Sequence, residues 1–101
     1  MEIKSELLNK ETQTKLTLDQ VYDALKQGNK RYINNQLTEV SLDGLRSDSV
    51  NGQFPQAIVL SCIDSRVVVE QVFDQALGDI FVARVAGNFA NTDIVASMEY
   101  A

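Results

Sequence analysis

Apolar residues recur at helical spacing between residues 17 and 34, which makes this segment the clearest helix in the chain. Thr17 and Gln20 match a capping box, in which each side chain accepts a hydrogen bond from the other residue's backbone N–H. We expect the helix to weaken at Gly28, because glycine costs about 1 kcal/mol relative to alanine inside a helix. The apolar face consists of Leu18, Val21, Tyr22, Leu25, Tyr32 and Ile33.

Two later apolar runs predict neighbouring strands of a parallel sheet. They span residues 56–63 and 80–85, and neither alternates cleanly between apolar and polar positions, which is typical of strands buried on both faces. Residues 67–79 between them favour either helix or strand, because three consecutive valines are β-branched. A last helix begins after Asn91 or Thr92, either of which can cap it.

The segments outside these elements are less regular. Residues 1–15 are polar and predict an N-terminal arm that is loose or helical, and residues 35–55 predict a loop with one helical turn around 44–50. The remaining order of helix, strand, short helix, strand and helix is typical of a βαβ unit. We therefore predict an α/β fold, with a parallel β-sheet and flanking helices, for residues 16–101.

This predicted sheet is incomplete within the chain. Two strands seldom form a stable sheet, since three or more are usually needed. Either a partner chain completes the sheet or the sequence is a truncated piece of a longer domain, and we favour truncation. In either case we expect the chain to associate, because unpaired sheet edges and uncovered apolar faces are liabilities for a monomer.

Charge and composition exclude several classes of function. The net charge of -5 argues against nucleic acid as a partner, because binding to phosphates needs a basic face. No apolar stretch approaches the roughly 18 residues of a membrane span, and the N-terminus does not resemble a signal peptide. The single cysteine cannot form an intramolecular disulfide, so a cytoplasmic location is the simplest expectation.

The chemistry-bearing residues lie where the first predicted strand ends. Cys62, Asp64 and Arg66 occupy alternate positions, and ligands bind at the carboxyl ends of strands in parallel sheets. A thiolate and a carboxylate can both ligate zinc, and an arginine can hold the carboxylate in a bidentate pair. Two alternatives are a small buried cysteine without chemistry and a phosphatase-like loop. The phosphatase alternative is disfavoured, because Arg66 follows the cysteine too closely and Asp64 would repel phosphate.

Longer motifs around these residues resemble the β-class carbonic anhydrases. The motifs are "SCIDSRV", with "GQFP" before it and "GDIFVARVAGN" after it, and the resemblance extends from about residue 17 to the final "SMEYA". The family pattern has a Cys-x-Asp-Ser-Arg run followed by Gly-Asp-x-Phe-Val-x-Arg-Asn-Ala-Gly-Asn. Val85 departs from it, because the family usually has asparagine there, and a polar contact beside the pocket is then absent.

The resemblance implies a zinc enzyme for the reversible hydration of carbon dioxide to bicarbonate. Cys62 corresponds to the first zinc ligand, and zinc would lower the pKa of its bound water to about 7. Asp64 and Arg66 correspond to a catalytic dyad in which the arginine draws the aspartate away from the metal. In the inactive form of the family, Asp64 itself would bind the metal.

The resemblance also implies substrate-binding residues and a dimer. Gln53 corresponds to a glutamine that hydrogen-bonds substrate, usually across a dimer interface, and Phe81, Ala86 and Gly87 correspond to walls of the carbon dioxide pocket. A homodimer or higher homo-oligomer is implied, in which the 17–34 helix crosses onto the partner. Without the family, Phe81 would be plain core, Gln53 solvated, Asp79 a turn residue, and Arg84 paired with an acidic neighbour or a partner subunit.

The family's other two zinc ligands, a histidine and a cysteine, would follow Ala101. The resemblance thus implies that this chain, which has no histidine, neither holds zinc tightly nor hydrates carbon dioxide by itself. Without metal, we expect the charge of Asp64 to disfavour the Cys62 thiolate. Two alternatives are an inactive fragment or pseudoenzyme that acts as a dimerisation module, and a hydrolase of a similar small molecule such as carbon disulfide.

Overall fold

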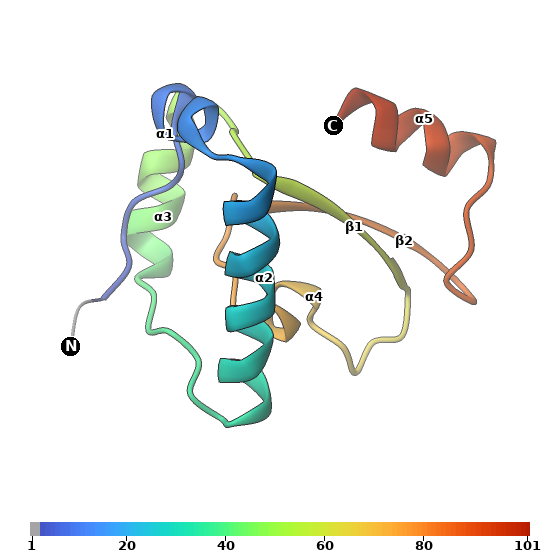
Figure 1. Ribbon diagram of the computed structural model, residues 1–101, viewed down its shortest axis with the longest axis horizontal. Helices are drawn as coiled ribbons and strands as arrows, with labels where there is room; N and C mark the ends of the chain where they lie inside the picture. The colour runs from blue at the N-terminus through green and yellow to red at the C-terminus, as the bar shows by residue number, and fades with distance from the viewer. Residues whose placement is uncertain (1–2) are drawn as a thin grey trace.

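The computed structural model describes residues 3–101 and shows an α/β fold, as predicted (Figure 1). In chain order the elements are α1 (Lys10–Lys15), α2 (Leu18–Ile33), α3 (Leu42–Asp48), the 3₁₀ turn η1 (Ser49–Asn51), β1 (Ala57–Cys62), α4 (Val69–Val72), β2 (Ile80–Val85) and α5 (Thr92–Tyr100). After β2 the chain turns back, so that α5 runs against the direction of the strands (Figure 1).

The two strands pair in parallel, which confirms the predicted topology. The register runs from Ala57 opposite Ile80 to Cys62 opposite Val85. β1 is one residue shorter at each end than the apolar run 56–63, and β2 matches its run. Parallel pairing aligns the carboxyl ends of both strands, so the loop that follows β1 and the loop that follows β2 leave the sheet at the same edge.

Helix α2 forms as predicted but does not weaken at Gly28. The capping box between Thr17 and Gln20 is present, and the helix continues to Ile33. Gly28 is buried because the backbone of Phe73 passes against it, and a Cβ atom built there would lie 1.7 Å from the Phe73 carbonyl oxygen. The amide of Asn29 donates to the Val72 carbonyl at 2.8 Å. Glycine thus permits close packing between α2 and the end of α4.

The N-terminal arm is bound to the rest of the molecule through side chains and backbone. Asn9 caps the short helix α1, and residue Lys4 forms a parallel bridge with Val40. The Lys4 ammonium contacts the buried carboxylate of Asp79 at 2.6 Å, and the Ala76 N–H donates to the same oxygen at 2.7 Å. Asp79 is therefore a buried anchor for the arm in addition to a turn residue.

The segment between α2 and β1 contains more helix than the sequence predicted. Instead of one turn around 44–50, α3 begins at Leu42 and is followed by η1. Ser41 caps α3 by accepting a hydrogen bond from the Gly44 N–H at 3.1 Å. Leu45 on this helix is fully buried, and with Val69, Ala76 and Ile80 it forms the buried apolar core of the described residues.

Asp74 joins three segments that are distant in sequence. It follows α4 in a left-handed conformation with φ of 47°, and its carboxylate is 7% exposed. It accepts hydrogen bonds from the Arg31 guanidinium, from the Thr38 N–H at 2.9 Å and from the Thr38 hydroxyl at 2.6 Å. Burial raises the pKa of Asp74, but the hydrogen bonds from Thr38 and Arg31 outweigh burial, so the pKa lies below its usual value.

We expect this carboxylate to make stability depend on acidic pH. A pKa lowered by folding contributes stability that is complete above the unfolded value, near 3.9, and is lost as the pH falls through the folded value. Asparagine tolerates the positive φ at this position, so Asp74→Asn changes mainly the charge. This variant should be roughly 1.5 kcal/mol less stable than the unmodified protein at pH 6. It should also lose less stability than the unmodified protein between pH 6 and pH 3. Urea denaturation at both pH values measures this.

The matched control is Asp43→Asn, because that side chain is 95% exposed. It should lose as much stability on acidification as the unmodified protein. An equal loss in the unmodified protein and in Asp74→Asn would contradict the prediction.

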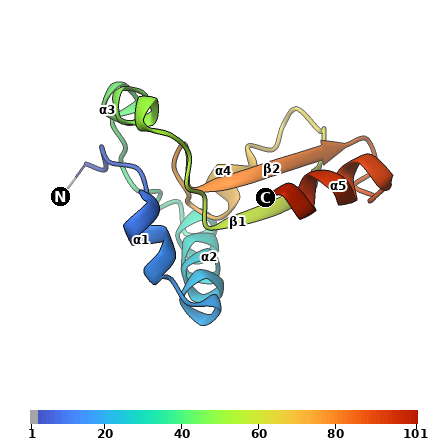
Figure 2. The same cartoon turned by 90° about the horizontal axis from the view of Figure 1, so that it is seen from above.

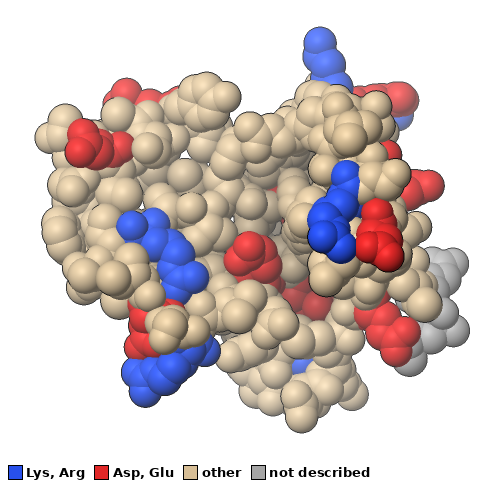
Figure 3. Space-filling model, turned by 180° about the vertical axis from the view of Figure 1, so that it is seen from behind, with Lys and Arg blue, Asp and Glu red and all other residues tan. Residues whose placement is uncertain are grey.

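The helices are unevenly distributed around the sheet. Figure 2 shows α1, α2 and α3 gathered toward the end where the strands begin, while α5 lies toward the other end. On the face shown in Figure 3, basic and acidic side chains form small groups separated by broad uncharged areas. Within residues 3–101, no helix has both the length and the apolar character needed to cross a membrane.

Candidate active site

The end of β1 and the loop that follows it carry three chemically distinctive side chains at the carboxyl edge of the sheet. Cys62 is the last residue of β1, and Asp64 and Arg66 lie in the irregular segment that leads to α4. The strand ends here because residues 65 and 66 form a turn, in which the Val67 N–H donates to the Asp64 carbonyl at 3.3 Å. This is the edge at which parallel α/β proteins bind ligands.

Asp64 and Arg66 form a bidentate pair. The Arg66 Nε and Nη2 atoms donate to the two carboxylate oxygens at 3.0 and 2.7 Å, and the Arg66 backbone N–H donates at 2.9 Å. The side-chain hydrogen bonds from Arg66 are the main reason that the pKa of Asp64 lies below its usual value. Both oxygens are thus occupied, and the carboxylate is held in its ionised form.

Cys62 lies beside backbone N–H groups that favour its thiolate. The amides of Gly87 and Asp64 lower the pKa of the thiol, while burial and the charge of Asp64 raise it, and the net direction is downward. The charge of Asp64 raises the pKa of the thiol, as expected, but the backbone amides, which the expectation did not include, lower it by more. A lowered pKa suits a metal ligand, since the thiolate is the form that binds metal.

Arg84 holds the loop by its backbone. From β2, its Nε atom donates to the Cys62 carbonyl at 2.8 Å, and its Nη2 atom donates to the carbonyls of Asp64 at 2.7 Å and Val67 at 3.2 Å. The sequence left two pairings open for Arg84, with an acidic neighbour or with a partner subunit. None of the ion pairs within the described part of the chain includes it, so the first is not found. The position of Arg84 in β2, opposite Ser61 and one residue before the end of the strand, is the feature that could have predicted its contact with the loop after β1.

The residues that the sequence resemblance assigned to a substrate site are divided between the two ends of the sheet. Ala86 and Gly87 follow β2, and the Gly87 amide lies next to Cys62. Phe81 lies four residues before the end of β2, roughly 13 Å along the strand from the level of Cys62. Gln53 is exposed and precedes β1, so within one chain it is not brought to Cys62.

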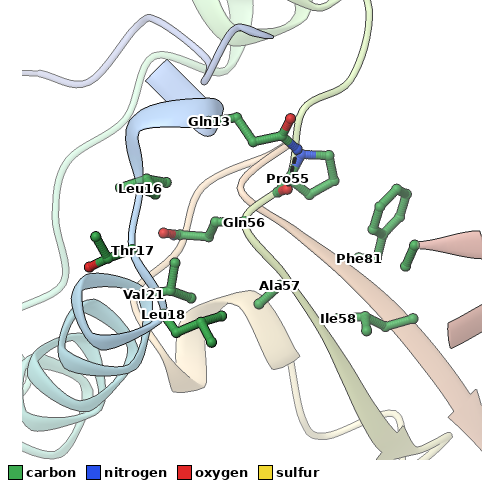
Figure 4. A pocket seen from close by; sticks show the side chains of 11 residues that line it. Gln13, Leu16, Thr17, Leu18, Val21, Pro55, Gln56, Ala57, Ile58 and Phe81 are labelled. Atoms are coloured by element: carbon green, nitrogen blue, oxygen red, sulfur yellow. Dashed lines mark hydrogen bonds between the residues drawn. The ribbon is translucent and has the colours of Figure 1, made fainter. Parts of the chain in front are cut away.

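Phe81 instead borders a cavity near the start of the strands (Figure 4). The cavity has a volume of about 340 Å³ and lies between the beginning of α2, the beginning of β1 and Ala101. Figure 4 shows Leu18 and Val21 from α2 on one side and Ile58 and Phe81 on the other. The Phe81 ring also packs edge-on against Tyr100 of α5, with centroids 6.5 Å apart, so it contributes to packing between α5 and β2.

The described residues do not form a complete metal site. A catalytic zinc ion takes three protein ligands and keeps one position open. Among the residues that the structure describes, no three His, Cys, Asp or Glu side chains lie close enough together to hold a metal ion. Cys62 fits zinc as a single ligand, and both oxygens of Asp64 already accept hydrogen bonds from Arg66.

Comparison with known proteins shows which family has a similar sequence in this loop and sheet. Residues 57–101 match the carbonic anhydrase family. Carbonic anhydrase 2 of Mycobacterium tuberculosis is 43% identical over 82 residues, and a carbonic anhydrase of Mycolicibacterium smegmatis has the same identity over the same length. These alignments cover 79% of this chain and 39% of each relative.

The chain belongs to the carbonic anhydrase family, in its β class. It spans about two fifths of the length of the curated relatives that it matches. The matched segment begins at β1 and includes the Cys62 loop, β2 and α5.

Proposed function

We propose that this chain forms the first part of the active site in a carbonic anhydrase of full family length, which reversibly hydrates carbon dioxide to bicarbonate. The observation that carries this proposal is the bidentate Asp64–Arg66 pair next to Cys62, whose thiolate is favoured by backbone amides. Membership of the family supports the reaction class and the use of zinc. We also propose a cytoplasmic location, where reducing conditions would keep the Cys62 thiol available as a ligand.

Each residue of the loop has a separate role in this proposal. Cys62 serves as one zinc ligand, and the rest of the ligand set lies outside this chain. Arg66 keeps Asp64 ionised and turned toward the guanidinium, so that the carboxylate does not occupy the metal. The backbone at Ala86 and Gly87, adjacent to Cys62, forms one wall of the substrate pocket.

The test uses a full-length protein that contains this chain. Cys62→Ser should abolish zinc binding and hydration, and Arg66→Gln should lower kcat/KM for hydration roughly 10- to 100-fold, as loss of a partner that orients groups at a metal site does. Arg46→Gln is the matched control, because that arginine lies on α3 and pairs with the exposed Asp43. Stopped-flow hydration and metal analysis measure both effects. Full activity in Arg66→Gln, or no hydration by the unmodified full-length protein, would refute the proposal.

We further propose that the protein is a homodimer in which α2 contacts the partner. Several large apolar residues of α2 are exposed in the single chain, with Leu18 at 89%, Tyr22 at 70% and Ile33 at 71%. Exposed apolar surface of this kind marks an interaction site. Gln53 is exposed and distant from Cys62 of its own chain, so we propose that it serves the active site of the partner chain. Phe81 of the same chain as Gln53 would contribute to the apolar wall of that site.

Light scattering tests the dimer, since one chain has a mass of 11.2 kDa. We expect twice that mass or more at micromolar concentrations, and we expect Tyr22→Glu to shift the population toward monomer by placing a charge in the interface. Gln27→Glu, also exposed on α2, is the control. A monomer at all concentrations would contradict this part of the proposal.

A further inference from the structure

The backbone of the Cys62 loop is held mainly by one side chain from the neighbouring strand. The loop has few hydrogen bonds of its own, and the backbone ones are long: Ile63 N–H to the Val85 carbonyl is 3.2 Å and Val67 N–H to the Asp64 carbonyl is 3.3 Å. The bonds from Arg84 to the carbonyls of Cys62 and Asp64 are 2.8 and 2.7 Å. The shortest bonds to the loop backbone therefore come from Arg84.

The chemistry of the guanidinium explains why arginine occupies this position. Its N–H donors are fixed in a planar fork, and a hydrogen bond from a charged donor is about twice as strong as one between neutral groups. Three carbonyls from residues 62, 64 and 67 converge on two nitrogen atoms of this fork. A lysine ammonium carries the same charge on a flexible stem, and it cannot reproduce the fork.

We propose that Arg84 is a positioning residue, whose fork fixes the backbone of residues 62–67 and so sets where the Cys62 sulfur and the Asp64 carboxylate lie. The effect of Arg84 on catalysis rests on the proposed function, whereas its effect on the loop does not. Arg84 acts through the loop carbonyls, while Arg66 acts on the carboxylate of Asp64, so the two arginines have different tasks.

The direct test is amide hydrogen exchange on the metal-free chain. In Arg84→Gln and Arg84→Lys, exchange at the Ile63, Arg66 and Val67 amides should become about tenfold faster or more, because three charge-assisted bonds to the loop are lost. Arg46→Gln is the control and should leave these rates unchanged. Unchanged exchange in both Arg84 variants would overturn the proposal. Normal exchange in the lysine variant alone would also overturn it, because charge and not the fork would then hold the loop.

A second measurement uses the unmodified chain, so it tests the proposal even if the Arg84 variants do not fold. In the unmodified chain, the Nε–H of Arg84 should exchange about tenfold more slowly than that of Arg46, because it donates to the Cys62 carbonyl. Equal rates would overturn the proposal. Since neither measurement uses activity, both separate the loop's geometry from the proposed reaction.

Kinetics on a full-length protein test the catalytic consequence. Arg84→Lys should lower kcat for hydration about tenfold and leave KM for carbon dioxide within about twofold, because the loop holds the catalytic groups and not the substrate pocket's apolar wall. Loosened exchange with unchanged kcat would overturn the positioning role. Absence of hydration in the unmodified full-length protein would refute the proposed function, and the exchange rates would still decide whether Arg84 holds the loop.

Discussion

The 101-residue chain, purified alone, is expected to carry far less than one zinc ion per molecule and to hydrate carbon dioxide no faster than the uncatalysed reaction. The ligand set explains this result. Three protein ligands are needed for a catalytic zinc, and the sequence offers one cysteine and no histidine. Asp64 could ligate a metal only by giving up its bidentate pair with Arg66, and that exchange would still provide just two ligands.

Two measurements on the same sample decide this prediction. Mass spectrometry gives the zinc content after gel filtration, and a stopped-flow assay gives the hydration rate. Cys62→Ser is the matched control, and it should equal the unmodified chain in both measurements, since a lone thiolate retains zinc poorly. Under the proposed function, a longer protein that contains this chain and two further zinc ligands should gain zinc and activity together.

One stoichiometric zinc with fast hydration would show that ligands come from elsewhere. A dimer could in principle place two Cys62 thiolates and two Asp64 carboxylates around one metal. That arrangement would fill all four positions and leave none for water, so it would give metal content without hydration. The two measurements therefore separate a shared structural metal from a catalytic one.

The fold was predictable from sequence where local signals decide it. The apolar runs at 56–63 and 80–85 became paired parallel strands, and the Thr17 capping box began α2, because such patterns depend on residues close in the sequence. The start of α3 was missed, although Ser41 is an ordinary cap residue, since two glycines and several turn formers nearby favoured a loop. The role of Gly28 was also hidden, because its neighbour Phe73 is 45 residues away.

The candidate site shows the same division. Cys62, Asp64 and Arg66 lie within five residues of one another, so their shared location could be read directly from the chain. The contribution of the Gly87 amide to the Cys62 pKa and the bonds from Arg84 to the loop depend on the register between β1 and β2. A single sequence does not specify which residues of two strands lie opposite each other, so these contacts could not be predicted from it.

The position of Gly28 leads to the second large expected effect. Gly28→Ala should destabilise the protein by about 3 kcal/mol, although alanine normally stabilises a helix interior by about 1 kcal/mol relative to glycine. The added Cβ would lie 1.7 Å from the Phe73 carbonyl oxygen, and a backbone atom cannot escape by changing rotamer. Helix α2 must therefore move away from the end of α4, or the chain after α4 must shift.

Either movement breaks further contacts between the same segments. The Asn29 amide bonds the Val72 carbonyl, and Arg31 pairs with Asp74, so both interactions depend on the distance that Gly28 permits. Urea denaturation measures the loss of stability, and circular dichroism shows whether the variant is folded in the absence of denaturant. Gln27→Ala, at an exposed position next to Gly28, is the matched control and should change stability by no more than about 0.5 kcal/mol. A Gly28→Ala variant as stable as this control would mean that α2 and the Phe73 backbone do not pack closely. Close packing would then not explain why glycine occupies position 28.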